Sequence, residues 1–173
     1  MAEKTIDIAS PILSRNERLA DQLRQRFNET NTYVINVLSS PGSGKTTTIL
    51  GTNERLRDKA GLRCAVIEGD IASDVDAITM KEAGMPAIQI NTGGLCHLEC
   101  NMIMEAVDAF DQAVGLENID VIFIENVGNL VCPVDFDLGE NLSIMILSVP
   151  EGDDKPIKYP GIFQHCLLYT SPS

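Results

Sequence analysis

Apolar and polar positions along the chain follow two different periods. Short, nearly continuous apolar runs rich in β-branched residues are typical of buried strands, and they occupy residues 33–39, 63–68, 87–91, 120–125 and 142–149. Apolar residues at helical spacing among charges predict helices over 11–27, 44–59, 75–83 and 98–114. Buried strands separated by helices require a mostly parallel sheet that is covered on both faces. The pattern therefore predicts a three-layer α/β/α fold.

Length and charge limit the class of protein further. A chain of 173 residues, 44% of them hydrophobic, can bury one sizeable core and is within the range of one domain. The net charge of −12 argues against a nucleic-acid partner, because such proteins usually carry a basic face. The chain has neither a signal-like N-terminus nor an apolar run of about eighteen residues. We therefore expect a cytoplasmic protein that does not enter a membrane.

A Gly-rich turn connects the first predicted strand to the helix that follows it. The string SSPGSGKT occupies residues 39–46, and strand, turn and helix in this order are the context of a phosphate-binding P-loop. Its backbone N–H groups would surround the phosphates of a nucleotide, Lys45 would reach the β- and γ-phosphates, and Thr46 would bind Mg²⁺. Ser39 stands where the first glycine of this motif is expected. The candidate nucleotide-binding residues are Pro41, Gly42, Ser43, Gly44, Lys45, Thr46 and Thr47.

Acidic residues follow two other predicted strands, at the sheet edge where ligands bind in such folds. Asp70 follows the second strand and is a candidate for holding Mg²⁺ through water, whereas Asp76 is either a partner of that site or a helix cap. Glu125 and Gly128 follow the fourth strand. An acid and a glycine in this position resemble the γ-phosphate sensor of GTPases, whose glycine N–H contacts the terminal phosphate. The alternative is an ordinary turn at a strand end.

Cysteine and histidine supply a second chemistry. The five cysteines are an odd number, which in a reducing compartment favours thiolate ligands or buried thiols; they are Cys64, Cys96, Cys100, Cys132 and Cys166. Cys96 and His97 follow the third strand and Cys132 follows the fourth, so neighbouring strand ends could bring them together. Thiolate and imidazole suit Zn²⁺ or Ni²⁺, but buried cysteines often serve only as small apolar residues. Three ligands leave a four-coordinate ion incomplete, so the fourth ligand would be a water molecule or a residue of a second copy of the chain. Cys100 could be a further ligand or a core residue.

Five separate strings resemble one family from about residue 8 to residue 164. They are SSPGSGKTT at 39–47, EGD at 68–70 with Asp76 beyond it, NTGGLCHLE at 91–99, IENVGNLVCPVDFDLGE at 124–140 and EGDDKPIKYPGIF at 151–163. The chain is identified on these strings as similar to the HypB family of hydrogenase nickel-incorporation GTPases. These are P-loop proteins of the dimerising class that includes the signal-recognition-particle and nitrogenase iron-protein groups.

The resemblance implies a function and a set of residue roles. HypB-like proteins hydrolyse GTP slowly, and their nucleotide state controls dimerisation and the delivery of nickel to the precursor of the [NiFe]-hydrogenase large subunit, together with HypA. The implied catalytic residues are Lys45, Asp70, Asp76 and Glu125. The implied Mg²⁺ residues are Thr46 and Asp70, and the implied Ni²⁺ or Zn²⁺ ligands at the dimer interface are Cys96, His97 and Cys132.

Two parts of the chain depart from the family. Residues 1–30, an expected N-terminal helical segment, contain neither Cys nor His, so we expect no N-terminal nickel store. The expected GTPase domain covers 31–164 without the Asn-Lys-x-Asp strand that recognises guanine, and 165–173 is an unrelated tail. His165 and Cys166 are accordingly not counted as ligands. A missing strand would leave an exposed sheet edge.

Other functions remain open from the sequence. A small-molecule kinase would need paired arginines in a substrate lid, and no Arg occurs beyond Thr79. A urease-type nickel GTPase would carry a Cys-Pro-His motif, whereas this chain divides that chemistry between Cys96-His97 and Cys132-Pro133. A third alternative is a metal-binding dimer scaffold that does not hydrolyse nucleotide.

Overall fold

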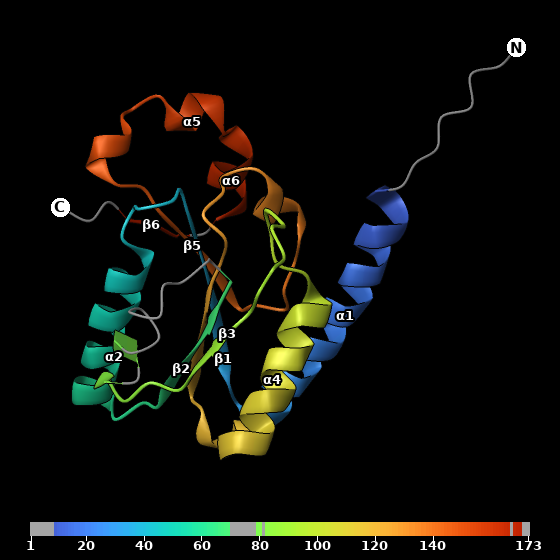
Figure 1. The fold of residues 1–173 in the computed structure, drawn as a ribbon, viewed down its shortest axis with the longest axis vertical. Coiled ribbons are helices and arrows are strands. Elements are labelled where there is room, and N and C mark those ends of the chain that lie inside the picture. Colours follow the sequence, from blue (N-terminus) through green and yellow to red (C-terminus); the bar gives the residue numbers. More distant parts are fainter. Residues whose placement is uncertain (1–8, 70–78, 81, 167, 171–173) are drawn as a thin grey trace, which may run out of the picture.

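The computed structural model describes residues 9–69, 79–80, 82–166 and 168–170. Within these residues the chain forms one six-stranded sheet in the order β3-β2-β4-β1-β5-β6, and each neighbouring pair of strands is parallel (Figure 1). The strands are β1 Tyr33–Ser39, β2 Cys64–Glu68, β3 Ala87–Gln89, β4 Val121–Glu125, β5 Leu142–Ile146 and β6 Leu168–Thr170. The predicted parallel sheet is therefore confirmed.

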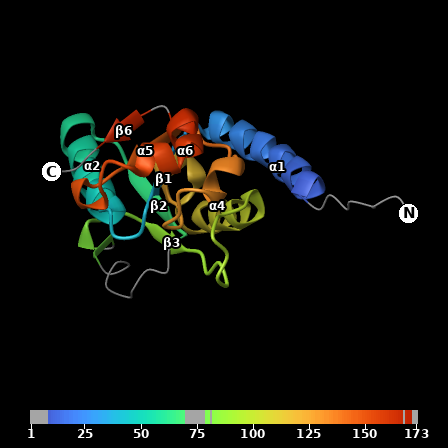
Figure 2. The ribbon, with the colours of Figure 1, turned by 90° about the horizontal axis from the view of Figure 1, so that it is seen from above.

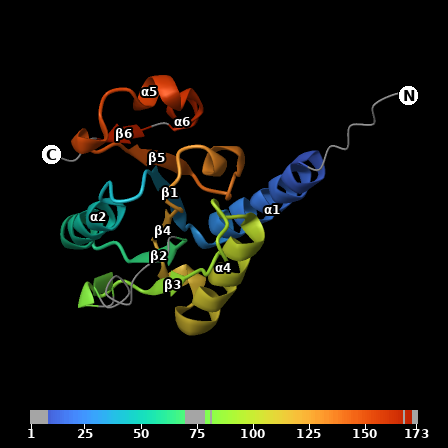
Figure 3. The same ribbon diagram turned by 45° about the horizontal axis from the view of Figure 1, so that its top comes forward.

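Helices lie on both faces of this sheet. The α-helices are α1 Ala9–Thr30, α2 Lys45–Ala60, α4 Cys100–Val114, α5 Lys155–Lys158 and α6 Pro160–His165. The described residues also include three short 3₁₀ helices, which follow α4, β4 and β5 in the chain: η1 Leu116–Asn118, η2 Cys132–Asp135 and η3 Val149–Glu151. Figure 2 and Figure 3 show α2 on one side of the sheet and α1 with α4 on the other. This arrangement confirms the three-layer α/β/α architecture.

Alternation along the buried strands directs apolar side chains into both faces of the sheet. In β4, Ile122 and Ile124 face the layer of α1 and α4, whereas Val121 and Phe123 face the layer of α2. Successive side chains of a strand point to opposite faces, so a strand that is apolar at every position must be covered on both. All five residues of β4 are buried. The continuous apolar runs in the sequence follow from this double burial.

The N-terminal helix α1 shares the main core. Its residues Leu23 and Phe27 are buried in one cluster with Phe110 of α4. On the outer surface, Arg26 forms ion pairs with Asp108 and, at 2.8 Å, with Asp111. The predicted helix over 11–27 is confirmed and extends a few residues further at both ends.

Two predicted strands end earlier in the structure. The strand expected over 142–149 ends at Ile146, because the Ser148 side chain and the Glu151 side chain form a capping box that starts η3. The strand expected over 87–91 ends at Gln89. Of the helix expected over 75–83, residues 75–78 and 81 lie outside the described residues, whereas Thr79, Met80 and Glu82 are helical.

The C-terminal residues correct the expectation of an open edge beside β5. Leu168–Thr170 form β6, which pairs in parallel register with Ile144–Ile146. Just before it, Cys166 is buried in a cluster with Met145 and Ile162. Parallel pairing uses backbone groups, so it places few demands on the side chains of the segment that occupies this position in the sheet. Across the described residues, no helix has both the length and the apolar composition needed to cross a membrane.

Candidate nucleotide and metal site

The candidate site lies where neighbouring parallel strands end. Glu125, the last residue of β4, is in register with Val37 of β1 and with Glu68, the last residue of β2. Both carboxylates are buried, Glu125 at 5% exposure and Glu68 at 2%. Buried carboxylates at strand ends mark a functional edge, since charge is placed in a core only with compensation. Glu125 was predicted from its place after the fourth strand, whereas Glu68 was not predicted as a site residue.

The turn between β1 and α2 has the backbone of a P-loop. Gly44 caps the N-terminus of α2 at φ 91°, a left-handed conformation that favours glycine. Lys45 begins the helix and is 4% exposed. The Ser43 hydroxyl donates to the carbonyl of Ser40 at 2.7 Å and so closes the turn. The first helical turn thereby directs its N–H groups toward the loop, as an anion site requires.

Serine replaces the first glycine of the motif without strain. Ser39 is still part of β1 and is in register with Ile146 of β5. Among the described residues, Asn31 is the non-glycine residue with a positive φ, so Ser39 needs no glycine-like backbone. Its hydroxyl donates to the carbonyl of Ser40 at 2.8 Å. The departure from the motif therefore leaves the P-loop conformation intact.

Thr46 and Glu125 meet across the sheet edge. The Thr46 hydroxyl donates a hydrogen bond of 2.9 Å to the Glu125 carboxylate. A hydroxyl at the start of α2 beside a buried carboxylate is a set of hard oxygen donors, which fits the preference of Mg²⁺. Asp70 and Asp76, the other predicted acids, lie outside the described residues.

Gly128 lies directly against the P-loop. A Cβ placed on Gly128 would come within 3.0 Å of the Pro41 backbone N and Cα and 2.9 Å of its Cγ. A side chain here cannot be accommodated without moving the loop. The segment after β4 therefore contacts the phosphate-binding turn through a glycine. A displacement of one segment at this contact would displace the other.

The loop after β5 also reaches the P-loop, a contact that was not predicted from the sequence. Burial would raise the pKa of Glu151, but hydrogen bonds from the Ser40 side chain and from the backbone and side chain of Ser148 outweigh it and lower that pKa. The Ser148 hydroxyl lies 2.7 Å from the Glu151 carboxylate. The capping-box pattern Ser148-x-x-Glu151 was the available signal.

The predicted soft-ligand residues come together above this edge. The Sγ of Cys96 lies 3.6 Å from Nδ1 of His97. A hydrogen bond between the Cys132 and Cys96 side chains, together with partial burial, raises the pKa of Cys132. Both cysteines are only partly buried. Residues from the ends of β3 and β4 thus form one thiol and imidazole cluster.

Asn129 shapes the turn that presents Cys132. Its side-chain Oδ1 accepts the backbone N–H of Val131 at 2.7 Å and of Cys132 at 3.2 Å. Its Nδ2 donates to the Sγ of Cys132 at 3.7 Å. Asparagine favours such an Asx turn, so Asn129 in the sequence Asn129-Leu130-Val131-Cys132 could have predicted this turn.

His97 lies against two other side chains. Its ring stacks on Phe136 with centroids 3.9 Å apart and an interplanar angle of 19°. Nε2 lies 3.4 Å from Oε1 of Glu99. Within one chain, the described His, Cys, Asp and Glu residues form no group of three or more arranged to hold a metal ion. A complete metal site at this cluster would need further donors.

The remaining cysteines belong to the core. Burial raises the pKa of Cys64 to about 11 and the pKa values of Cys100 and Cys166 to about 12. Cys100 begins α4 and donates from Sγ to the carbonyl of Asp137 at 3.0 Å. The structure thus places Cys100 in the core, away from the cluster of Cys96 and Cys132. His165 lies beside Ser143, 3.4 Å from its hydroxyl.

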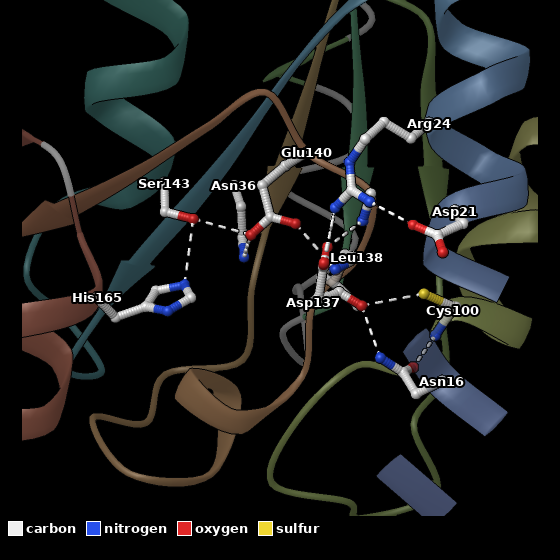
Figure 4. Close-up of polar contacts among 11 residues, drawn as sticks. Asn16, Asp21, Arg24, Asn36, Cys100, Asp137, Leu138, Glu140, Ser143 and His165 are labelled. Atoms are coloured by element: carbon white, nitrogen blue, oxygen red, sulfur yellow. Dashed lines mark hydrogen bonds and ion pairs between the residues drawn. The ribbon is translucent and has the colours of Figure 1, made fainter. Parts of the chain in front are cut away.

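A polar network supports the loop that carries Cys132 (Figure 4). The Asn36 Nδ2 in β1 donates to Glu140 at 3.0 Å, and the Asn126 Nδ2 donates to Asn36 Oδ1 at 3.1 Å. Glu140 also accepts from the Ser143 hydroxyl at 2.8 Å. The network therefore joins the residue after Glu125 to the far end of the loop.

A second part of this network ties the loop to α1. Asp137 accepts two hydrogen bonds from the Arg24 guanidinium, at 2.8 and 2.6 Å, and its carbonyl accepts one from Asn16 at 2.6 Å. The hydrogen bond with Asp137 raises the pKa of Arg24 despite partial burial. The loop is thus fixed at both ends, by Gly128 at the P-loop and by Asp137 at α1.

The parallel sheet, the Gly-rich turn before α2 and the buried acid beside Thr46 define a P-loop nucleotide-binding domain. The profile of the "CobW/HypB/UreG, nucleotide-binding domain" family matches residues 33–147, and the chain belongs to this family. It is 45% identical over 161 residues to the "Hydrogenase/urease maturation factor HypB" of Helicobacter hepaticus and 47% identical over 160 residues to the "Hydrogenase maturation factor HypB" of Escherichia coli strain K12. These alignments include 93% and 92% of this chain but 65% and 53% of the relatives, so the chain spans about half to two thirds of their length.

Solved structures give the same picture. The crystal structure of HypB from Helicobacter pylori in complex with nickel is 43% identical, with a TM-score of 0.81, covering 90% of this chain and 70% of that one. HypB from Archaeoglobus fulgidus is 39% identical, with a TM-score of 0.82, covering 91% and 74%. The signal recognition particle receptor FtsY of Elizabethkingia anophelis, at 17% identity and a TM-score of 0.58 over 90% and 58%, shares the fold.

Proposed function

We propose that this chain is the nucleotide-binding part of a GTP-hydrolysing metallochaperone that carries nickel to a precursor of [NiFe]-hydrogenase. The observation that carries the proposal is the contact of Gly128 with Pro41, four residues before Cys132. One loop therefore contacts the phosphate turn and presents a thiol. The names of the relatives as hydrogenase maturation factors support the assignment.

Nucleotide binding and hydrolysis would use the residues at the strand ends. The P-loop N–H groups and Lys45 would hold the phosphates, and the Gly128 N–H would contact the terminal phosphate. Thr46 and Asp70 would hold Mg²⁺, which when bound neutralises charge that develops on the phosphate oxygens. Glu125, with Asp76, is proposed to orient the attacking water. Loss of the γ-phosphate then removes one contact that holds the Gly128 segment.

Nickel, the cargo, would bind to Cys96, His97 and Cys132, and Zn²⁺ could occupy the same soft ligands. Among the described residues of one chain the cluster lacks a full ligand set. Leu95 and Val131 flank it and are 43% and 57% exposed. A second copy of the chain would supply the missing ligands, and it would also supply an apolar surface to cover Leu95 and Val131. We therefore propose a homodimer that depends on GTP and metal, and we expect HypA and the hydrogenase precursor as partners in the cytoplasm.

Phosphate release and metal titration test this function. The wild-type chain is expected to release phosphate from GTP, whereas Lys45→Ala is expected to lose this activity. Nickel affinity should differ among the nucleotide-free, GDP-bound and GTP-analogue-bound states, since coupling between two binding sites is reciprocal. Equal nickel affinities in the three states would refute the coupling. Metal binding without phosphate release would instead support a non-hydrolysing dimer scaffold.

A second recipient deserves its own test. The Helicobacter hepaticus relative is named a maturation factor for both hydrogenase and urease, which favours urease as an alternative recipient. The nickel-loaded chain can be offered to purified nickel-free hydrogenase large subunit or to nickel-free urease. We expect transfer to the hydrogenase subunit; transfer to urease alone would assign the urease role.

A further inference from the structure

The two nitrogens of His97 lie in different surroundings. Nδ1 faces the Sγ of Cys96 at 3.6 Å. Nε2 is buried, with less than 1 Å² of accessible surface, and forms no hydrogen bond among the described residues. The nearest carboxylate oxygen that faces it is Oε1 of Glu99, at 3.4 Å. The stacking of the ring on Phe136 restricts rotation of the imidazole. An ion that enters between the two thiols can therefore meet Nδ1 but not Nε2.

Glu99 is placed to hold this orientation. It is the N-cap residue of α4, but its side chain makes no capping hydrogen bond. Its carboxylate is therefore available to His97, and the positive end of the helix dipole stabilises a negative charge there. In proteins, a metal-binding histidine usually donates its second ring N–H to a carboxylate, which fixes the ring and strengthens the ligand.

We infer that His97 binds the metal through Nδ1 and that Glu99 is the positioning residue that accepts a hydrogen bond from Nε2–H once the ion is bound. This inference rests on the proposed metal-binding function and deepens it. The ligand class is a soft or borderline divalent cation, Ni²⁺ or Zn²⁺, bound by two thiolates and one imidazole. The role of Glu99 is to orient the imidazole, and it does not contact the ion.

The ring assignment can be read directly from the zinc-loaded protein. Long-range proton–nitrogen spectra of ¹⁵N-histidine-labelled protein distinguish a metal-bound nitrogen from a protonated one. The chain has two histidines, so in the variant His165→Gln all remaining histidine signals belong to His97. We expect Nδ1 to shift on addition of zinc and Nε2 to remain protonated. A metal shift at Nε2 would overturn the inference.

The role of Glu99 is tested by affinity and spectrum together. Glu99→Gln and Glu99→Ala should weaken Zn²⁺ and Ni²⁺ binding by roughly 10- to 100-fold, as loss of such a partner usually does. The Ni²⁺ derivative should also change its absorption spectrum, a signature that a purely structural role would leave unaltered. Glu105→Gln removes an equal charge from an exposed position of the same helix and should change neither. Glu99→Asp is expected to restore part of the affinity.

The outcomes separate this inference from the proposed function. If the wild-type chain binds metal, and Cys96→Ala and Cys132→Ala abolish binding, the site stands. Unchanged affinity and spectra in the folded Glu99 variants would then overturn the positioning role alone. If the wild-type chain binds neither ion, or if the cysteine variants bind as well as wild type, both the site and the role of Glu99 are refuted. Circular dichroism confirms that each variant is folded.

Discussion

Gly128 and Pro41 lie so close that a single methyl group would not fit between them, at 2.9–3.0 Å from the proline atoms. Gly128→Ala should therefore displace either the P-loop or the loop that carries Cys132. We expect weaker GTP binding, slower phosphate release and a loss of about 1–3 kcal/mol in the free energy of unfolding, typical of overpacking. Nucleotide titration and urea unfolding measure both effects.

Gly161→Ala is the matched control. A Cβ on Gly161 would meet its nearest neighbour, Val134 Cγ1, at an ordinary 3.9 Å. This variant should bind nucleotide like the wild type. If the two alanine variants have equal nucleotide affinity and equal rates of phosphate release, the contact between Gly128 and Pro41 does not matter for nucleotide binding or hydrolysis.

Removing the Thr46 hydroxyl should weaken the site in two ways. Thr46→Ala deletes the donor of the 2.9 Å hydrogen bond to Glu125, and a hydrogen bond to a charged group contributes about 1.5–3 kcal/mol. It also deletes the proposed Mg²⁺ oxygen. We expect a higher Mg²⁺ requirement for phosphate release, measured by magnesium titration. Thr46→Ser keeps the hydroxyl and should remain close to wild type; if it fails as Thr46→Ala does, the methyl group matters and the hydroxyl does not.

The five thiols should react at very different rates. A pKa of about 11 for Cys64 and about 12 for Cys100 and Cys166 leaves roughly one thiol in a thousand or fewer ionised at pH 8, and the thiolate is the reactive form. Brief iodoacetamide labelling followed by peptide mass spectrometry should modify Cys96 first. Cys132 should follow more slowly, because the hydrogen bond to Cys96 raises its pKa. Early labelling of Cys100 would contradict its place in the core.

Glu151 should make stability depend on pH. Its pKa lies below the ordinary 4.5 because hydrogen bonds from Ser40 and Ser148 outweigh burial. A carboxyl with a lowered pKa stabilises the fold above its ordinary pKa, and this contribution is lost as the pH falls through the folded-state value. Glu151→Gln should therefore be less stable than wild type at pH 7, and the difference should vanish in urea unfolding at acidic pH below that value. The exposed Glu54→Gln serves as the control; a difference that grows toward acid would reverse the sign and refute the argument.

The buried amides of Asn36 and Asn126 should act as a unit. Each alanine variant leaves the other side chain without the 3.1 Å hydrogen bond between them. A double-mutant cycle on the free energy of unfolding is expected to give an interaction energy of about 0.5–3 kcal/mol. Additive single effects would show that the two amides are independent.

The positions of β1 to β5 were predictable from the sequence, but not every strand end was. The strand over 33–39 is confirmed at both ends, because a doubly buried strand is apolar at nearly every position and is followed at once by a Gly-rich turn. The strand expected over 142–149 was too long. Leu147 continues the apolar pattern, but the capping box of Ser148 and Glu151 starts a helical turn, and local hydrogen bonds override the apolar run.

The candidate site was predictable where its residues follow strand ends. Parallel strands end at one edge, and this placed Thr46 beside Glu125 and Cys96 beside Cys132. The roles of these residues in hydrolysis and metal binding stay predictions. The positions of Asn129 and Glu99 depend on side-chain orientations within loops, and an apolar or polar pattern carries no information on those. The strand formed by Leu168–Thr170 was missed because its pairing with β5 comes from the backbone.

Asn36 has a consequence for how the chain reaches this fold. Asn36 lies in the central strand β1, where it is in register with Ile124 of β4 and with Ser143 of β5. Apolar strands alone would tolerate sliding past one another, since each offers similar side chains along its length. A slip of β1 by one residue would turn the Asn36 amide to the opposite face of the sheet. There it would be buried in an apolar core, without hydrogen bonds to Asn126 or Glu140. A single polar side chain thus selects one alignment of the central strands from several that would bury equal apolar area.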